Sequence, residues 1–263
     1  MSPLRRVKDT SFRTDQWFFI VSPPLLYTLF ALQVNRSPRI MWQGGFEYIM
    51  ETKDRNDLIQ YGLALVKEGL TFGSGGNLSV RSDDSKGFFI TPSGMAYDCL
   101  KKSDLVRMDL EGNIIGGLRK PSSEWHMHAA IYRARPDIRA LIHCHSHYIS
   151  AFSTLGEDLG PVSYLIASAG AASVPLAPYE TFGTDALAQS AVKAMGERSK
   201  AVILANHGLI AGGRNLKEAL SLTRDLEFCA FMYMTALATQ KPIQMIPEEK
   251  MNEVIEKLKT YGQ

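Results

Sequence analysis

Apolar residues recur along this chain with two different spacings. Between residues 55 and 68 they recur at helical intervals, and Gly69 follows as a helix-ending residue, so a first helix is predicted here. Short apolar runs separated by glycine- and serine-rich turns come next, and such runs are typical of a meander of short strands. We predict strands over residues 78–81, 88–90 and 105–110, a turn at 111–113 and extended residues at 114–115.

After residue 120 the pattern alternates between helices and strands. A helix is predicted to begin at residues 121–124 with a serine at its N-cap. Extended segments are expected at residues 140–147, 164–170, 174–177 and 201–206, and helices at 184–195, 216–237 and 248–258. Phe228, Phe231, Met232 and Met234 form an apolar stripe that we interpret as core packing. This order predicts one α/β domain.

Histidines cluster at the end of the strand predicted for residues 140–147. Side chains two residues apart on a strand share a face, so His143 and His145 can reach one metal ion, although an isolated pair is equally compatible with a hydrogen-bonded histidine pair. His147 lies about 13 Å from His143 along an extended strand and is left as structural. His207 ends a second apolar run and is the best candidate for a third ligand.

Composition narrows the class of protein. The 263 residues are 45% hydrophobic and 21% charged, which is ordinary for a soluble globular protein, and a net charge of +2 argues against a nucleic-acid surface. The three cysteines are scattered, so a disulfide framework is disfavoured and a reducing, cytoplasmic location is expected.

The N-terminal 49 residues call for a separate interpretation. A basic start precedes two apolar runs, but Pro23 and Pro24 divide them, and neither run approaches the ~18 to 20 residues that span a bilayer. We therefore expect no membrane anchor. Residues 1–49 are interpreted as an extension, either disordered or the product of a misassigned start, and residues 50–263 as the folded domain.

Three loops carry groups suited to binding phosphate. Residues 73–76 and 91–94 are rich in glycine and hydroxyl groups, and residues 121–124 begin a helix. The lysine of a P-loop and the G-x-G-x-x-G spacing are both absent, which disfavours nucleotide binding. Each loop alone is compatible with a plain turn or helix cap. Beside a metal ion, however, Glu124 is a natural base for proton transfer next to a carbonyl, which points to carbon–carbon bond chemistry through an enediolate.

Several motifs resemble those of the class II aldolase/adducin family, within it most closely the L-fuculose-1-phosphate aldolases. The resemblance covers residues 50–263. It rests on Gly75–Arg81, Thr91–Gly94, Pro121–Trp125, His143–His145, Ala177–Thr184, His207–Ile210 and Lys259–Gly262. It implies a three-layer α/β/α fold with a central, largely antiparallel sheet flanked by helices.

The resemblance also implies roles for particular residues. His143, His145 and His207 match ligands of one zinc ion per subunit, and Glu124 matches a residue that contacts the metal in the empty site and then acts as general acid/base. Phosphate would be bound by Asn77, Ser93, Gly94, Ser122 and Ser123. Tyr164 and Tyr261 match tyrosines at the aldehyde end that reach the site across a subunit boundary, which implies a homotetramer.

The implied reaction is reversible cleavage of a ketose 1-phosphate, foremost L-fuculose 1-phosphate, to dihydroxyacetone phosphate and a small hydroxyaldehyde such as L-lactaldehyde. A pentulose-phosphate 4-epimerase, a methylthioribulose-phosphate dehydratase and a non-catalytic adducin-like scaffold are the alternatives. Glu124 stands where epimerases typically carry Asp, and the retained ligands disfavour a scaffold. The aldehyde itself stays open, because one methyl or hydroxyl group changes binding by only about 1 to 3 kcal/mol.

Overall fold

The computed structural model describes residues 38–260, with side chains from residue 53 onward, and the chain divides into units of residues 1–45 and 46–263. The second unit is built on an eight-stranded sheet with the order β4-β3-β2-β1-β5-β8-β7-β6. Its strands are β1 (Asn77–Arg81), β2 (Gly87–Ile90), β3 (Val106–Asp109), β4 (Ile114–Gly116), β5 (Ala140–Cys144), β6 (Leu176–Ala177), β7 (Ala201–Leu204) and β8 (Gly208–Gly213). All neighbours pair antiparallel except β6 and β7.

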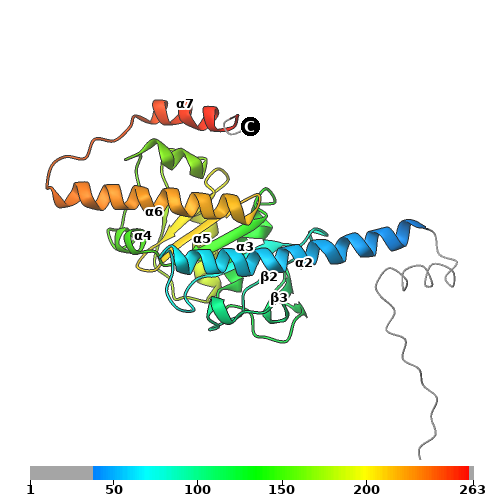
Figure 1. The fold of residues 1–263 in the computed structure, drawn as a ribbon. Helices are drawn as coiled ribbons and strands as arrows, with labels where there is room; N and C mark the ends of the chain where they lie inside the picture. The colour runs from blue at the N-terminus through cyan, green and yellow to red at the C-terminus, as the bar shows by residue number, and fades with distance from the viewer. Residues whose placement is uncertain (1–37, 261–263) are drawn as a thin grey trace, which may run out of the picture. The chain divides into compact units, whose positions relative to one another are not determined.

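Helices cover both faces of this sheet. They are α2 (Pro38–Lys67), α3 (Trp125–Ala134), α4 (His147–Phe152), α5 (Asp185–Met195), α6 (Leu216–Ala238) and α7 (Glu248–Leu258), with 3-10 helices η1 (Tyr97–Cys99), η2 (Lys102–Asp104) and η3 (Tyr164–Ala169). Figure 1 shows α6 running across the sheet with α4 beside it. The expected α/β class and its three layers are confirmed.

The alternation of side chains along β5 divides the core in two. Leu141 packs in one core with the buried residues of α3 and α5, while its neighbour Ile142 packs in the other with those of α4 and α6. Strand β5 therefore lies between the two cores, inside the sheet between β1 and β8, and is fully buried along its length.

The first helix and the 164–170 segment differ from the sequence-based expectations. The helix predicted for residues 55–68 begins at Pro38 rather than near Arg55, so Met50, the expected domain start, lies within it. Residues 164–169 form η3 instead of an extended piece, because the Ser163 hydroxyl accepts a hydrogen bond from Leu165 N at the start of the helix.

The apolar stripe on α6 is only partly core. Phe228 is 50% exposed and Phe231 38% exposed, because α6 turns Leu226, Cys229 and Tyr233 toward the sheet instead. The N-terminal apolar runs lie outside the described residues. Among residues 38–260, no helix combines the length and apolar character that a membrane span requires.

Candidate metal centre and its cavity

The candidate metal centre begins at the carboxyl end of β5. His143 is fully buried on this strand, and it pairs in register with Asn77 at the start of β1. The strand ends at Cys144, so His145 lies beyond it rather than on it, contrary to the simple strand interpretation. The chain turns there, and the Nε2 atoms of the two histidines come within 2.9 Å of each other.

The third histidine arrives from the other side of β5. The hairpin between β7 and β8 pairs Leu204 with Gly208, and the turn between these residues carries His207. Asn206 adopts a positive φ of 54°, a conformation that asparagine tolerates better than most residues, and it directs the chain into His207. The ligand atoms of His143, His145 and His207 all lie within 4.8 Å of one another. The three predicted histidines thus form one cluster.

Glu124 faces the same space from the start of α3. Its carboxylate oxygens lie 3.1 Å from His143 Nε2 and 3.5 Å from His207 Nε2. A sequence-based detail is wrong here: the N-cap of α3 is Glu124, not a serine, and its φ of −98° and ψ of 15° lie in the sparsely populated bridge region. Ser122 lies two residues before the cap: its hydroxyl accepts a hydrogen bond from Glu124 N, and its own backbone N–H donates to Thr91 O, which binds the turn to the neighbouring loop.

The donor set is suited to a cation. The Nδ1–H of His143 donates to the carbonyl of Leu209 at 2.9 Å, which leaves Nε2 as the atom that faces the cluster. There it meets the imidazole of His145 and the carboxylate of Glu124, whose Oε1 is buried without a hydrogen-bond partner. So many electron-rich atoms in one place need a proton or a metal ion between them.

Shifts in pKa follow from this crowding. Burial raises the pKa of Glu124, but the charge and hydrogen bond of His143, together with His207 and Asn77, outweigh it and bring that pKa below its usual range. Burial lowers the pKa of His143, whereas Glu124 raises it, and the net direction is upward. Burial and the charge of His143 lower the pKa of His145 and of His207 to about 4. Both are therefore neutral at pH 7, as metal ligation requires.

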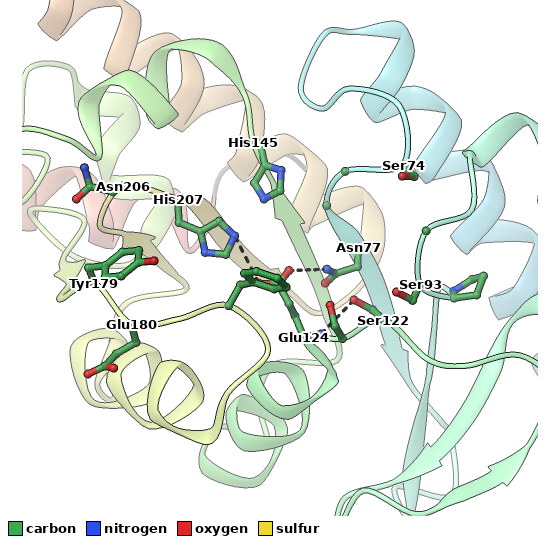
Figure 2. Close-up of a pocket in the computed structure, with 16 residues that line it drawn as sticks. Ser74, Asn77, Ser93, Ser122, Glu124, His145, Tyr179, Glu180, Asn206 and His207 are labelled. Carbon is green, nitrogen blue, oxygen red and sulfur yellow. Dashed lines mark hydrogen bonds and ion pairs between the residues drawn. The ribbon is translucent and has the colours of Figure 1, made fainter.

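A cavity of about 340 Å³ opens beside the histidines. Figure 2 shows Asn77, Ser93 and Ser122 on one side of Glu124, and His145 and His207 on the other. All five residues expected to hold phosphate line this cavity: Asn77, Ser93, Gly94, Ser122 and Ser123. Two hydrogen bonds, Ser122 N to Thr91 O and Ser93 N to Lys120 O, bring their loops together.

Gly76 shows how closely the glycine-rich loop approaches the metal strand. Its φ is +69°, and an added Cβ would lie 2.4 Å from the carbonyl oxygen of His143. Only glycine fits there without a shift of the backbone. The glycine-rich loop that lines one wall of the cavity is therefore packed directly against the backbone of His143, the first histidine of the cluster.

Two other singled-out residues lie elsewhere, and the position of a third is not described. Tyr164 is 57% exposed at the start of η3 and is absent from the lining of the cavity in this chain. Tyr261 lies outside the described residues. His147, left as structural, begins α4 and meets the ring of Phe72 edge-on, with centroids 4.6 Å apart.

Sequence reasoning missed several residues of the cavity wall. Tyr179, Glu180 and Phe182 line it beside Asn206. The first three belong to the Ala177–Thr184 motif that carries the family resemblance, so the signal was present without a role attached to it. Glu227 was also missed: from α6 its carboxylate accepts hydrogen bonds from groups directly after His145, and no local pattern in α6 announces that contact.

An α/β fold with three histidines and a carboxylate converging beside an anion-compatible cavity is the arrangement of a metal-dependent enzyme. A family model described as "Class II Aldolase and Adducin N-terminal domain" matches residues 56–234. The chain belongs to this family. With the histidines and the acid retained, it is a metal-dependent aldehyde-lyase of the class II aldolase type.

Named relatives agree with this assignment. A 5-deoxy-D-ribulose 1-phosphate aldolase of Bacillus thuringiensis serovar kurstaki is 45% identical over 211 residues, which are 80% of this chain and 98% of the relative. An L-fuculose phosphate aldolase of Escherichia coli is 42% identical over 200 residues, 76% of this chain and 91% of the relative. A solved L-fuculose 1-phosphate aldolase superposes with a TM-score of 0.76 at 43% identity, covering 79% of this chain and 96% of that chain.

Proposed function

We propose that the protein is a zinc-dependent aldolase that reversibly cleaves a ketose 1-phosphate to dihydroxyacetone phosphate and a small hydroxyaldehyde. One observation carries this function: Glu124 borders both the three-histidine cluster and a cavity walled by hydroxyl groups and glycines. A proton-transfer group, a metal site and an anion-binding site could therefore all contact the same bound substrate.

Each part of the site has a distinct role in this reaction. Ser93, Ser122 and Ser123, with Asn77 and Gly94, would hold the phosphate through neutral donors, since the part of the chain that the structure describes brings no lysine or arginine to the cavity lining. His143, His145 and His207 would hold the metal, and Glu124 would contact it in the empty site. Zinc, when bound, supplies Lewis-acid stabilisation of the negative charge that develops on the ketose oxygens.

Glu124 is the proton carrier. In cleavage, Tyr164 of a neighbouring subunit would take the proton of the C4 hydroxyl as the bond between C3 and C4 breaks, so that C4 becomes the aldehyde carbon. The electron pair of the broken bond stays with C3, which then takes a proton from the protonated Glu124 carboxyl group. In synthesis, Glu124 removes that proton from dihydroxyacetone phosphate. Its lowered pKa suits the second direction, because the carboxylate is ionised at neutral pH.

The preferred sugar is the finer part of the proposal. L-Fuculose 1-phosphate is the first candidate, supported by relatives of that name at 42% identity. The relative at 45% identity favours 5-deoxyribulose 1-phosphate as a second candidate. Both share the dihydroxyacetone phosphate half and differ in the aldehyde, which has three carbons in one case and two in the other.

The proposal also covers the oligomeric state, the domain bounds and the cellular compartment of the protein. The exposure of Tyr164 supports a homotetramer in which Tyr164 and Tyr261 reach the aldehyde end of a neighbouring subunit's site. Residues 50–263 would form the aldolase domain, and residues 1–49 an extension. Cys99, Cys144 and Cys229 form no disulfide bonds, which supports a location in a reducing compartment such as the cytoplasm.

The test is release of dihydroxyacetone phosphate by the zinc-loaded protein from four ketose 1-phosphates: L-fuculose, L-rhamnulose, D-ribulose and 5-deoxy-D-ribulose. We expect turnover of at least one of them, abolished by a chelator and restored by zinc. Borohydride added with substrate should leave activity intact, because no Schiff base forms. Release from none of the four, or inactivation by borohydride, would contradict the proposed function.

A further inference from the structure

A buried chain of hydrogen bonds leads from the core to Glu124. Tyr132 OH lies 2.7 Å from Ser79 Oγ, which lies 2.6 Å from His128 Nδ1. His128 Nε2 lies 2.5 Å from Asn77 Oδ1, and Asn77 Nδ2 lies 2.9 Å from Glu124 Oε2. All five residues are at least 94% buried, and His128 is buried completely. No sequence motif had assigned a role to His128.

The direction of every hydrogen bond in this chain follows from its last member. Because the Glu124 carboxylate accepts, the amide nitrogen of Asn77 faces it and the amide oxygen faces His128. His128 must then donate from Nε2–H and accept at Nδ1 from the hydroxyl of Ser79. A reversed Asn77 amide would place its oxygen against the carboxylate and is excluded by repulsion.

His128 stays neutral in this position. Burial first, and then the charge of His143, lower the pKa of His128 to about 3. A neutral imidazole with one N–H is the form that the chain of donors demands. The network therefore has one arrangement at neutral pH, and it presents a fixed donor to Glu124.

We propose that His128 is a positioning residue of the reaction: by holding the Asn77 amide, it keeps the Glu124 carboxylate aimed into the cavity. The inference rests on the proposed function. Glu124 lies at an N-cap without a side-chain capping bond of its own, and its Oε1 has no hydrogen-bond partner. Asn77 is thus the neutral group that orients it, and His128 orients Asn77.

Two substitutions separate this role from core packing. The side-chain amide of Gln reaches the Nε2 position of a histidine, whereas that of Asn reaches only the Nδ1 position. His128→Gln keeps the donor to Asn77, while His128→Asn keeps only the contact with Ser79. We expect His128→Gln to retain kcat within about tenfold and His128→Asn to lose roughly 10²-fold in kcat with little change in KM, as for a misplaced catalytic group.

A control variant, together with kcat, KM and zinc content, distinguishes loss of positioning from loss of metal or of phosphate binding. His126→Gln changes a half-buried histidine on the same helix, outside the chain of hydrogen bonds, and should leave kcat unchanged. Zinc content should be equal in all variants. Equal kcat in His128→Gln and His128→Asn would overturn the inference, as would a rise in KM alone, which would mean that Asn77 serves only the phosphate.

A second measurement on the wild-type protein needs no turnover. With ¹⁵N-labelled histidine, the imidazole of His128 should be observed as the neutral Nε2–H tautomer in the zinc-loaded enzyme. Observation of the Nδ1–H tautomer would overturn the inference even if the variants fail to fold. The two proposals can fail separately. If the enzyme acts on none of the ketose 1-phosphates, the proposed function is rejected. The positioning contact is still supported if His128 is the Nε2–H tautomer and Glu124 is displaced in crystals of His128→Asn.

Discussion

Replacement of Glu227 by glutamine is expected to loosen the metal centre from a distance. The Glu227 carboxylate accepts hydrogen bonds from Ser146 Oγ at 2.6 Å, Tyr148 N at 2.9 Å and Ile149 N at 3.0 Å. These donors form the first turn of α4 and directly follow His145. Glu227 therefore ties the turn that follows His145 to α6, and a carboxylate is a good partner for a helix start.

The expected loss can be worked out from these contacts. Glutamine keeps one acceptor oxygen and no charge, so at least one of the three donors loses its partner. Hydrogen bonds to charged groups contribute about 1.5 to 3 kcal/mol each, and a lost helix cap costs ~1 kcal/mol. We expect Glu227→Gln to lower the free energy of unfolding by about 2 kcal/mol, which lowers Tm by roughly 4 to 8 °C for a domain of this size.

Metal affinity should fall as well, because His145 loses the anchor of the turn that follows it. Loss of outer contacts around a metal ligand typically costs about 10- to 100-fold in affinity. Thermal unfolding and zinc competition with a chromophoric chelator measure the two effects. The matched control is Glu68→Gln, which breaks an exposed pair with Arg224 on the same helix and should cost at most ~1 kcal/mol without changing zinc affinity. Unchanged zinc affinity in Glu227→Gln would refute the anchoring argument.

Four further substitutions test other parts of the structure. His207→Ala should abolish stoichiometric zinc in elemental analysis, and retained zinc would mean that another residue is the third ligand. Glu124→Gln should keep zinc but slow proton exchange at the dihydroxyacetone phosphate carbon by ~10² to 10⁴-fold, measured by deuterium wash-in. Tyr164→Phe should harm aldehyde turnover more than this exchange, and an equal loss would contradict its proposed role. The pKa of Asp54 is raised from 3.8 to about 6, first by burial and then by the charges of Asp83 and Asp57. The protonated carboxyl group therefore contributes folding stability that is fully present below pH 3.8 and is lost as pH rises through about 6. Asp54→Asn should therefore raise stability at pH 8 by on the order of 1 kcal/mol, after a discount for solvent screening, with no gain at pH 3.5 in denaturant titrations. An equal gain at both pH values would contradict this sign.

Local patterns were enough to select the residues that the structure brings together at the candidate site. The His-x-His at the end of an apolar run, the serine pair before Glu124 and the glycine-rich loop each carry their meaning within a few residues, because ligand types and turn residues are constrained by geometry at short range. The strand periodicity around His143 also predicted a buried strand correctly. These features needed no knowledge of distant contacts.

Local patterns failed where the partner of a residue comes from far along the chain. The stripe containing Phe228 satisfied a helical core pattern, yet the sheet takes the face of α6 that bears Leu226 and Tyr233. The serine expected to cap α3 yields that position to Glu124, since the loop beside it is bound to Thr91. In both cases packing between distant segments overrides a sound local preference.

The amino-acid sequence therefore indicated which residues we propose to bind and react, because that information lies in residue types and short spacings. The tertiary structure alone decided how they are oriented. The pairing of β5 with β1 and β8 places Asn77 and the Leu209 carbonyl beside His143, and α3 and α6 bring His128 and Glu227 to their partners. These contacts join residues at least 51 positions apart in the sequence, so no short-range pattern encodes them.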